Sequence, residues 1–504
     1  MVTEKYVGAI DQGTTGTRFM VFDASSNLLG SIYKEHKQLF PEPGFVEHDP
    51  LEIWNNTQYV VRETLEKIGI SLDDLIAVGI TNQRETTIVW DRYTGHPIHN
   101  AIVWQCLRTA GICDELKESG WEPLIKERTG LVTATYFSGP KITWLLDNVP
   151  GARKRAEKGD LLFGNIDTWL IWNLTGGING GIHVTDVSNA SRTMLMNLKK
   201  LNWDDEIREQ LRIPVSMLPE IRPSCDPETY GQVALKGISG RTPVSGDLGD
   251  QQAALFGQTC FDIGSAKNTY GTGNFLLLNT GSKIVKSESG LLTTVAYGLG
   301  KDIYYALEGS IAVGGAVIQW LRDQLQIIGD ASESEDLAQS VPSNGGVYFV
   351  PAFVGLFSPH WDITARGTLV GLTRGSNRGH IARAALESIA FQSYDVFRAM
   401  EVDSGIKLES LRVDGGASKN NLLIQFQADL LGIECIRPKV EETTALGAAY
   451  AAGLAVDFWK SIEELREKWV VDRTFKPQMT QEQRQKMIYF WKKAINKAKG
   501  WIET

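Results

Sequence analysis

Two short turns rich in glycine and threonine constrain this chain more than any other feature. The first, at residues 11–15, reads Asp-Gln-Gly-Thr-Thr and lies between apolar segments at residues 7–10 and 19–22. The second, Gly271-Thr272-Gly273, lies about half a chain later between two further β-rich segments. Each pattern predicts a β-hairpin whose turn lacks bulky side chains and can point backbone N–H groups at a phosphate. Two such hairpins predict two related lobes that close on one nucleotide.

The size of the chain implies more than one core. It has 504 residues, of which 42% are hydrophobic, so two or three domains are expected. Strand-like runs alternate with amphipathic segments, which is typical of an α/β protein. A net charge of −9 with mixed signs leaves no basic stripe for nucleic acid. Any phosphate site must therefore rest on local amides, a metal and a few cations.

Cysteine spacing and hydropathy bear on the compartment. The five cysteines are scattered and lack CxxC spacing, which argues against a disulfide framework and against a zinc site. No apolar run reaches the roughly 18 residues that a membrane-spanning helix needs. A cytoplasmic protein without a membrane span is the expectation.

Asp11 stands at the predicted end of the first strand, beside the first turn. There its carboxylate could hold Mg²⁺ through water while the turn amides meet phosphates. An ordinary hairpin with an Asx-type turn would give the same pattern. A Walker A loop is excluded, because the only Gly-Lys pair, Gly300-Lys301, is followed by Asp302 and has no glycine five residues before it.

A second group of acids lies in the glycine-rich segment 246–252, which contains Asp247, Asp250, Gln251 and Gln252. This segment is predicted to form a bend that enters an apolar helix. A carboxylate at such a bend could accept a proton from a substrate hydroxyl or help to bind a metal. A solvent-facing helix cap is the other interpretation.

Two further segments admit both a functional and a structural interpretation. Arg84 and Glu85 lie between two predicted strands, where they could bind neighbouring hydroxyls of a polyol or form an ordinary surface ion pair. Segment 411–421 ends a strand in two glycines before a helix. This pattern suits close approach of a purine, with Asn420 as a hydrogen-bonding partner, and equally a capped β-to-α turn.

Taken together, these segments resemble the glycerol kinases, a group within the FGGY family of carbohydrate kinases and the superfamily of actin, Hsp70 and hexokinase. The resemblance covers nearly the whole chain. Its most specific pieces are residues 11–15, 81–87, 136–148, 188–193, 249–257, 269–273, 306–309, 351–355, 367–387 and 442–447. It implies an α/β fold with two actin-like (ribonuclease H-like) lobes around a central nucleotide cleft. Residues 1–253 would form the N-terminal domain on the glycerol and phosphate side, and residues 254–504 the C-terminal domain on the nucleotide side.

The resemblance also implies an activity, which is transfer of the γ-phosphoryl group of ATP to glycerol, giving sn-glycerol 3-phosphate. ATP and Mg²⁺ would be the cofactors, and a homodimer or tetramer the assembly. By matching position, Asp250 would be the general base and Asp11 would orient Mg²⁺. Glycerol would be bound by Arg84, Glu85, Asp250 and Gln251 through its hydroxyls and by Trp104, Tyr136 and Phe275 through its carbons. The nucleotide and its phosphates would be held by Thr14, Thr15, Arg18, Thr272, Gly315, Gln319, Gly416 and Asn420.

Two other functions compete with this one. An FGGY kinase for a pentulose or another polyol would share the fold. Glycerol is favoured over these acceptors by Arg84-Glu85, by Trp104 and by Asp250-Gln251. A non-catalytic nucleotide-driven binding module, as among Hsp70 relatives, would need a linker and a separate β-rich peptide-binding domain. The sequence shows neither of these features.

Overall fold

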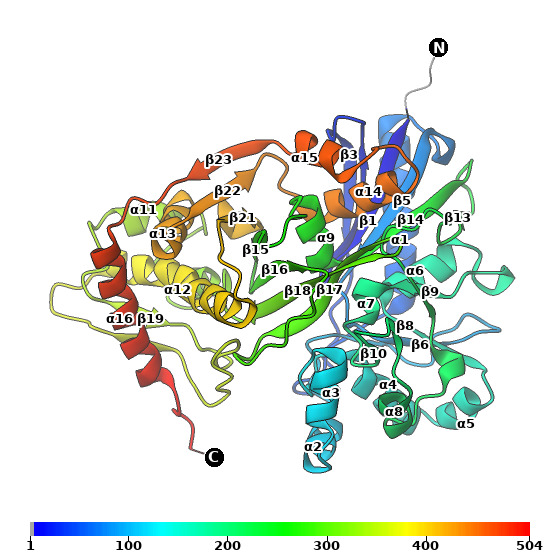
Figure 1. Cartoon of the computed structure of the whole chain (residues 1–504), viewed down its shortest axis with the longest axis horizontal. Helices are drawn as coiled ribbons and strands as arrows, with labels where there is room; N and C mark the ends of the chain where they lie inside the picture. The colour runs from blue at the N-terminus through cyan, green and yellow to red at the C-terminus, as the bar shows by residue number, and fades with distance from the viewer. Residues whose placement is uncertain (1–4, 504) are drawn as a thin grey trace.

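Two mixed β-sheets, each covered by helices, organise the computed structural model of the chain, which describes residues 5–503 (Figure 1). The first sheet has six strands in the order β13-β14-β5-β1-β2-β3. The second has seven strands in the order β17-β18-β16-β15-β21-β22-β23. This arrangement confirms the predicted α/β fold with two lobes.

Both predicted glycine-threonine hairpins are present. In the first sheet β1 (Tyr6–Gln12) pairs antiparallel with β2 (Gly16–Phe22). In the second, β15 (Ala266–Tyr270) pairs antiparallel with β16 (Asn274–Gly281). The first strand of each hairpin also has a parallel neighbour, which is β5 (Leu75–Asn82) for β1 and β21 (Ser410–Asp414) for β15. The two hairpins therefore occupy equivalent inner positions in the two sheets.

The predicted bend at residues 246–252 is wrong in its first half. Residues 246–249 complete β14 (Thr242–Gly249), which runs parallel to β5, and α9 (Asp250–Gly257) begins directly after it. A Cβ at Gly246 would lie only 2.5 Å from the backbone nitrogen of Ala452. This glycine thus permits close packing of a helix and does not make a turn. Asp247 is consequently fully buried within the strand.

Two helices between the sheets join the lobes (Figure 1). α14 (Thr443–Ala455) packs on β5, β14 and β1 of the first sheet and on α9. A Cβ at Gly447 would lie 1.8 Å from the carbonyl oxygen of Ala253, so the helices can touch only because this residue is glycine. One apolar core includes residues of both helices and of both sheets. The predicted domain limit after residue 253 falls within α9 and stays a prediction.

Each lobe also has a core of its own. In the first lobe α1 (Pro50–Ile68) and α6 (Ile166–Leu174) cover the sheet. In the second lobe the core lies between the sheet and α12 (Arg378–Ser404), α13 (Asn421–Leu431) and α16 (Gln481–Ala498).

The remaining elements complete the two lobes. Those before residue 250 are β3 (Leu28–Glu35), β4 (Glu47–His48), β6 (Ile88–Asp91), β7 (Ala101–Ile102), α2 (Ala110–Glu118), α3 (Glu122–Thr129), α4 (Ser138–Asn148), α5 (Ala152–Glu157), β8 (Leu161–Gly164), β9 (Val184–Asp186), α7 (Val187–Ala190), β10 (Met196–Asn197), β11 (Asn202–Trp203), α8 (Asp205–Gln210), β12 (Glu220–Arg222) and β13 (Gln232–Val233). Those after it are β17 (Leu292–Leu299), β18 (Asp302–Ile311), α10 (Ala316–Asp323), α11 (Glu333–Gln339), β19 (Tyr348–Val350), β20 (Thr368–Val370), β22 (Glu434–Pro438), α15 (Ile462–Lys468) and β23 (Val471–Phe475).

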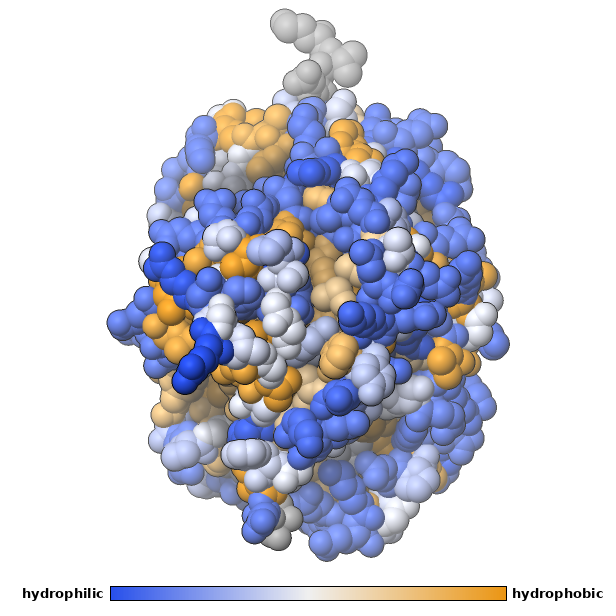
Figure 2. Space-filling view, turned by 90° about the vertical axis from the view of Figure 1, so that its left-hand side faces the viewer, coloured by the Kyte–Doolittle hydropathy of each residue, from blue (hydrophilic) through white to orange (hydrophobic). Residues whose placement is uncertain are grey.

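The outer face of the second lobe is predominantly hydrophilic, with apolar residues distributed between the polar ones (Figure 2). Within residues 5–503, no helix combines the length and the apolar character that crossing a membrane requires.

Candidate active site

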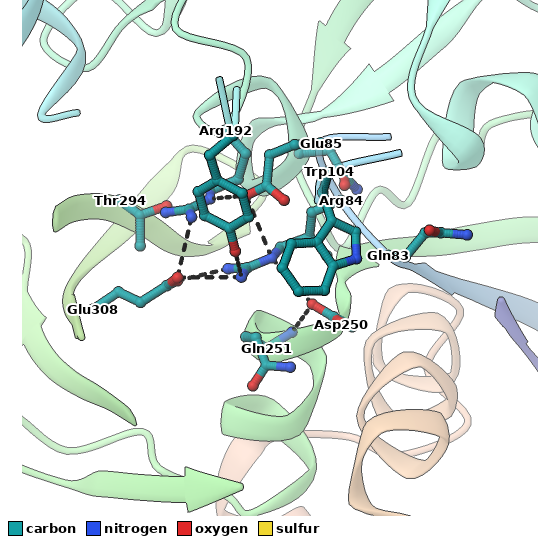
Figure 3. A network of polar contacts seen from close by, with 12 residues as sticks. Gln83, Arg84, Glu85, Trp104, Arg192, Asp250, Gln251, Thr294 and Glu308 are labelled. Carbon is teal, nitrogen blue, oxygen red and sulfur yellow. Dashed lines mark hydrogen bonds and ion pairs between the residues drawn. The ribbon is translucent and has the colours of Figure 1, made fainter. Parts of the chain in front are cut away.

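A network of four buried charged side chains lies where the two lobes meet (Figure 3). The first lobe contributes Arg84 and Glu85, from the connection between β5 and β6, and Arg192, which follows α7. The second lobe contributes Glu308, from β18. The Glu308 carboxylate accepts from Arg84 Nη1 at 2.6 Å and from Arg192 Nη2 at 3.1 Å. Arg192 Nε donates to Glu85 Oε1 at 2.7 Å.

Burial decides between the two interpretations of the Arg84-Glu85 pair. Their side chains are only 3% and 1% exposed, so the pair is not a surface ion pair. Burial alone would lower the pKa of Arg84, but Glu308 and Glu85 raise it well above its ordinary value. Glu308 has a lowered pKa, because Arg192 and Arg84 outweigh the opposing effect of burial. Arg84 and Glu308 are therefore both charged at neutral pH.

Arg84 is held in an unusual backbone conformation by its surroundings. Its φ of 48° lies in the left-handed region, which is uncommon for a residue with a side chain. A Cβ at Gly249 would lie 2.8 Å from Arg84 Cγ, so the glycine before α9 makes room for the arginine stem. Beyond Glu308, the guanidinium reaches Asp250 Oδ1 from Nε at 3.1 Å and donates to the Tyr136 hydroxyl from Nη2 at 3.1 Å. All three of its nitrogens thus have protein partners.

Asp250 is the first residue of α9, at the edge of this network (Figure 3). Its side chain is 29% exposed, and Oδ1 accepts from the backbone N–H of Gln251 at 2.7 Å. Burial raises the pKa of Asp250, with Glu85 adding to the rise and Arg84 opposing it. A partly accessible carboxylate of raised pKa, held by an arginine, suits a general base.

Three aromatic side chains form one partly exposed wall. The rings of Trp104 and Tyr136 lie 5.6 Å apart between centroids, and those of Trp104 and Phe275 lie 6.3 Å apart. Both pairs meet edge to face. Trp104 Nε1 donates to Thr14 Oγ1 at 3.0 Å, which links this wall to the turn of the first hairpin. The structure therefore brings together aromatics that, taken singly, look like separate core residues.

The first hairpin presents charged groups from both lobes. Arg18 on β2 forms an ion pair with Glu442, the residue before α14, and Thr15 is exposed at the turn. Burial raises the pKa of Asp11 to about 7, with Glu442 and Asp250 adding to the rise and Arg18 opposing it. Burial and the two neighbouring carboxylates therefore outweigh the attraction of Arg18.

The donor set fits a magnesium ion bound in the manner usual for phosphoryl transfer. Residues 5–503 contain no cluster of three or more His, Cys, Asp or Glu side chains that could hold a metal alone. Mg²⁺ is usually bound by one or two carboxylates, with substrate phosphates and water completing the coordination. Asp11 and Asp250 provide two such carboxylates, and a cation would offset the burial and the smaller carboxylate repulsion that raise the pKa of Asp11.

The nucleotide-side residues also converge. Gly315 N donates to Gly271 O at 2.8 Å, and Ala316 N donates to Thr272 O at 3.1 Å, so the second turn contacts the start of α10. A Cβ at Gly315 would lie 4.0 Å from Ala417 Cβ, which places the 416–419 segment beside this turn. A Cβ at Gly416 would meet nothing within 4 Å, so packing within the protein does not require glycine there.

Gln319 and Asn420 differ in solvent exposure and in their hydrogen bonds within the protein. Gln319 is exposed on α10. Asn420 Oδ1 accepts from Leu423 N at 2.9 Å as the N-cap of α13, and its Nδ2 lies 3.5 Å from Ser334 Oγ. The helix-cap interpretation of Asn420 is thus confirmed, whereas a contact with a purine stays a prediction.

Sequence reasoning missed three buried charges in the site, namely Arg192, Glu308 and Lys267. Each lies in or beside a segment that carries the family resemblance, yet none received a role. A signal existed for Glu308, because it is the only charged residue in the apolar run at residues 303–313. A lone acid in such a run is rarely tolerated without a buried partner.

Comparison with known proteins gives matches along almost the whole chain. The N-terminal domain of the FGGY family of carbohydrate kinases matches residues 6–257, and its C-terminal domain matches residues 266–456. Glycerol kinase 2 of Thermotoga maritima is 59% identical over 497 residues, which cover 99% of each chain. A glycerol kinase of Chloroflexus aurantiacus is 60% identical over 500 residues, 99% of this chain and 100% of that one. The crystal structure of Plasmodium falciparum glycerol kinase with ADP is 39% identical, covers 99% of both chains and has a TM-score of 0.92.

Proposed function

The chain belongs to the FGGY family of carbohydrate kinases, and from this premise we propose that it phosphorylates glycerol with ATP to give sn-glycerol 3-phosphate. The observation that carries the proposal is the arrangement around Asp250. A partly exposed carboxylate is held by a buried arginine, beside three aromatic rings and between two glycine-threonine hairpins. Full-length similarity to glycerol kinases, at 59% and 60% identity, supports the same acceptor.

The acceptor site suits a small triol. Hydroxyl groups can hydrogen-bond to polar groups of Arg84, Glu85, Asp250 and Gln251. The carbon chain can be covered by the wall of Trp104, Tyr136 and Phe275. Selectivity for a molecule with three hydroxyls needs several converging polar partners and walls that exclude longer sugars. A pentulose would need room beyond these rings, which is why glycerol is preferred over the alternative acceptors.

In the reaction, Asp250 removes the proton from the attacking terminal hydroxyl of glycerol. The new bond forms between that oxygen and the γ-phosphorus, the bond from the γ-phosphorus to the bridging oxygen breaks, and ADP leaves. The turn residues Thr14, Thr15 and Thr272 hold phosphate oxygens, and Arg18 stabilises their charge. Asp11, with Asp250 nearby, would hold Mg²⁺, which neutralises charge on the phosphates when bound.

The nucleotide lies on the second lobe in this proposal. Gly315 and Gly416 border it where no side chain blocks the approach, and Gln319 and Asn420 are the polar groups beside it. Closure of the two lobes would exclude water, which favours transfer to glycerol over hydrolysis of ATP.

The proposal is tested by measuring the turnover of ATP with Mg²⁺ in the presence of one acceptor at a time. The acceptors are glycerol, dihydroxyacetone, erythritol and xylulose, and one assay contains no acceptor. Strong selectivity for glycerol is expected, and a preference for xylulose would overturn the acceptor assignment. Asp250→Asn should lower kcat by about 10²–10⁴-fold, because it removes the general base. Asp205→Asn, at a side chain that is 81% exposed, is the control and should leave kcat unchanged.

Assembly and location complete the proposal. The family resemblance predicts a homodimer or tetramer in the cytoplasm. Light scattering of the purified protein measures the oligomeric state.

A further inference from the structure

Lys267 is a fully buried lysine at the centre of the second sheet. It lies on β15 and pairs with Leu277 on one side and Arg412 on the other. Its ammonium forms no ion pair with any carboxylate among residues 5–503 and is instead surrounded by neutral oxygens. Burial lowers the pKa of Lys267 to about 8, with Asp414, Asp250 and Glu308 opposing. A buried ammonium without a direct counter-ion is costly, so its place in the fold needs a reason.

The partners of this ammonium belong to the proposed substrate site. Nζ donates to Gln251 Oε1 at 2.5 Å, to Thr269 Oγ1 at 2.9 Å and to the backbone oxygen of Phe275 at 3.3 Å. An ammonium has three N–H donors and no acceptor, so these contacts use all of its hydrogen bonds. Gln251 and Phe275 are two of the residues assigned to glycerol.

The contact with Gln251 fixes which end of its amide is free. The oxygen and nitrogen of a glutamine side chain are nearly equal in shape, so an unconstrained amide can present either end. Because Lys267 can only donate, the atom that it contacts must be the oxygen. Gln251 Nε2 then points away from Lys267 and interacts with the carboxylate of Asp250 at the edge of the substrate site.

We propose that Lys267 is a positioning residue that locks the Gln251 amide with its N–H₂ group toward the acceptor substrate. The inference rests on the proposed function and names one element of its specificity. Gln251 acts as a donor, whereas the carboxylates of Asp250 and Glu85 act as acceptors. The substrate atom that meets Gln251 must therefore accept a hydrogen bond, as a hydroxyl or carbonyl oxygen does.

Two variants separate this role from a merely structural one, since Lys267 also contacts two residues of the second hairpin. Lys267→Met should raise the KM for glycerol about 10-fold, as expected for loss of one directed hydrogen bond, and change the KM for ATP by less than about 2-fold. In a Gln251→Ala background the same substitution should change the KM for glycerol by less than about 2-fold. Equal effects in both backgrounds would show that Lys267 does not act through Gln251.

Gln251→Glu tests the donor role without altering Lys267. The new carboxylate can pair with the ammonium, so the melting temperature should not fall, but the group that faces the substrate becomes an acceptor. The KM for glycerol and the dissociation constant from calorimetry should both rise about 10-fold or more. Unchanged glycerol affinity in this variant would overturn the proposal, even if Lys267→Met failed to fold.

A matched control and the wild-type enzyme complete the experiment. Lys286→Met removes an ammonium that is 59% exposed and should leave both KM values unchanged. No turnover of glycerol by the wild type would refute the proposed function. Turnover by the wild type with normal glycerol affinity in Lys267→Met and Gln251→Glu would refute the positioning role alone.

Discussion

Removing the charge of Glu308 is expected to destabilise the protein strongly, because this carboxylate is the only second-lobe member of the buried four-charge network. Arg84, Glu85, Arg192 and Glu308 carry two positive and two negative charges, and the side chains of both arginines and of Glu308 are at most 3% exposed. Glu308→Gln keeps the shape of the side chain and opens no cavity. It leaves the buried network with one uncompensated positive charge.

The magnitude follows from this geometry. Breaking a buried ion pair by removing one partner costs about 3–5 kcal/mol. Glutamine retains one accepting oxygen for the contacts at 2.6 and 3.2 Å from Arg84, so the lower limit, about 3 kcal/mol, applies. For lobes of this size that corresponds to a fall in melting temperature of about 6–12 °C.

Differential scanning fluorimetry of the wild type and the variant measures this fall. The matched control is Glu441→Gln, whose ion pair with Lys419 is exposed at both ends, 61% and 64%. Exposed pairs contribute about 0–1 kcal/mol, so the control should melt within about 4 °C of the wild type. A shift for Glu308→Gln no larger than that of the control would refute the reasoning, because the network would then be as well solvated as a surface pair.

The remaining predictions concern pH, the phosphate turn and the aromatic wall. Burial raises the pKa of Asp167 to about 7 and that of its neighbour Asp247 well above the ordinary value, so both carboxyls stabilise the fold while they are protonated, and this stability is lost as the pH rises from their ordinary pKa range through the raised values. Asp247→Asn, which stays neutral, should therefore melt like the wild type at about pH 4.5 and about 4 °C higher at about pH 8, and a lower melting temperature at about pH 8 would contradict this. Glu442→Gln should release Arg18 for phosphate and lower the KM for ATP by up to about 5-fold in steady-state assays, since the pair is partly exposed; an unchanged or raised KM would count against it. Phe275→Ala should open the wall, raise the KM for glycerol about 10-fold or more and improve turnover of erythritol relative to glycerol, whereas unaltered acceptor selectivity would show that the ring does not limit substrate size.

Local patterns in the sequence were sufficient for the elements that carry the site. Both hairpins were predictable, because a glycine-threonine turn between two β-rich segments is decided by residues close in sequence. Local patterns wrongly predicted a bend at Gly246, where glycine is required by a contact that is distant in the sequence. Its missing Cβ leaves room for α14, a helix about 200 residues later in the chain, and no local pattern records that contact.

The residues themselves suggested a functional role for Asp250 and, less strongly, for Arg84, whereas the three aromatics were predicted as site residues only through the family resemblance. Burial excluded the surface interpretation of the Arg84-Glu85 pair, which lies in the interior. Asn420 caps α13, and its contact with a purine stays a prediction.

The sequence by itself determined the α/β class, the two glycine-threonine turns and the residue types available for the chemistry, because these depend on local propensity and composition. Only the tertiary structure decided how the charges pair. Arg84 and Glu308 are 224 residues apart, yet they share a buried hydrogen bond, and Lys267 reaches the side chain of Gln251 through the interior of the molecule. Such contacts depend on how the two sheets pack against α9 and α14. The free energy of burying each of these charges therefore depends on partners that are distant in the sequence.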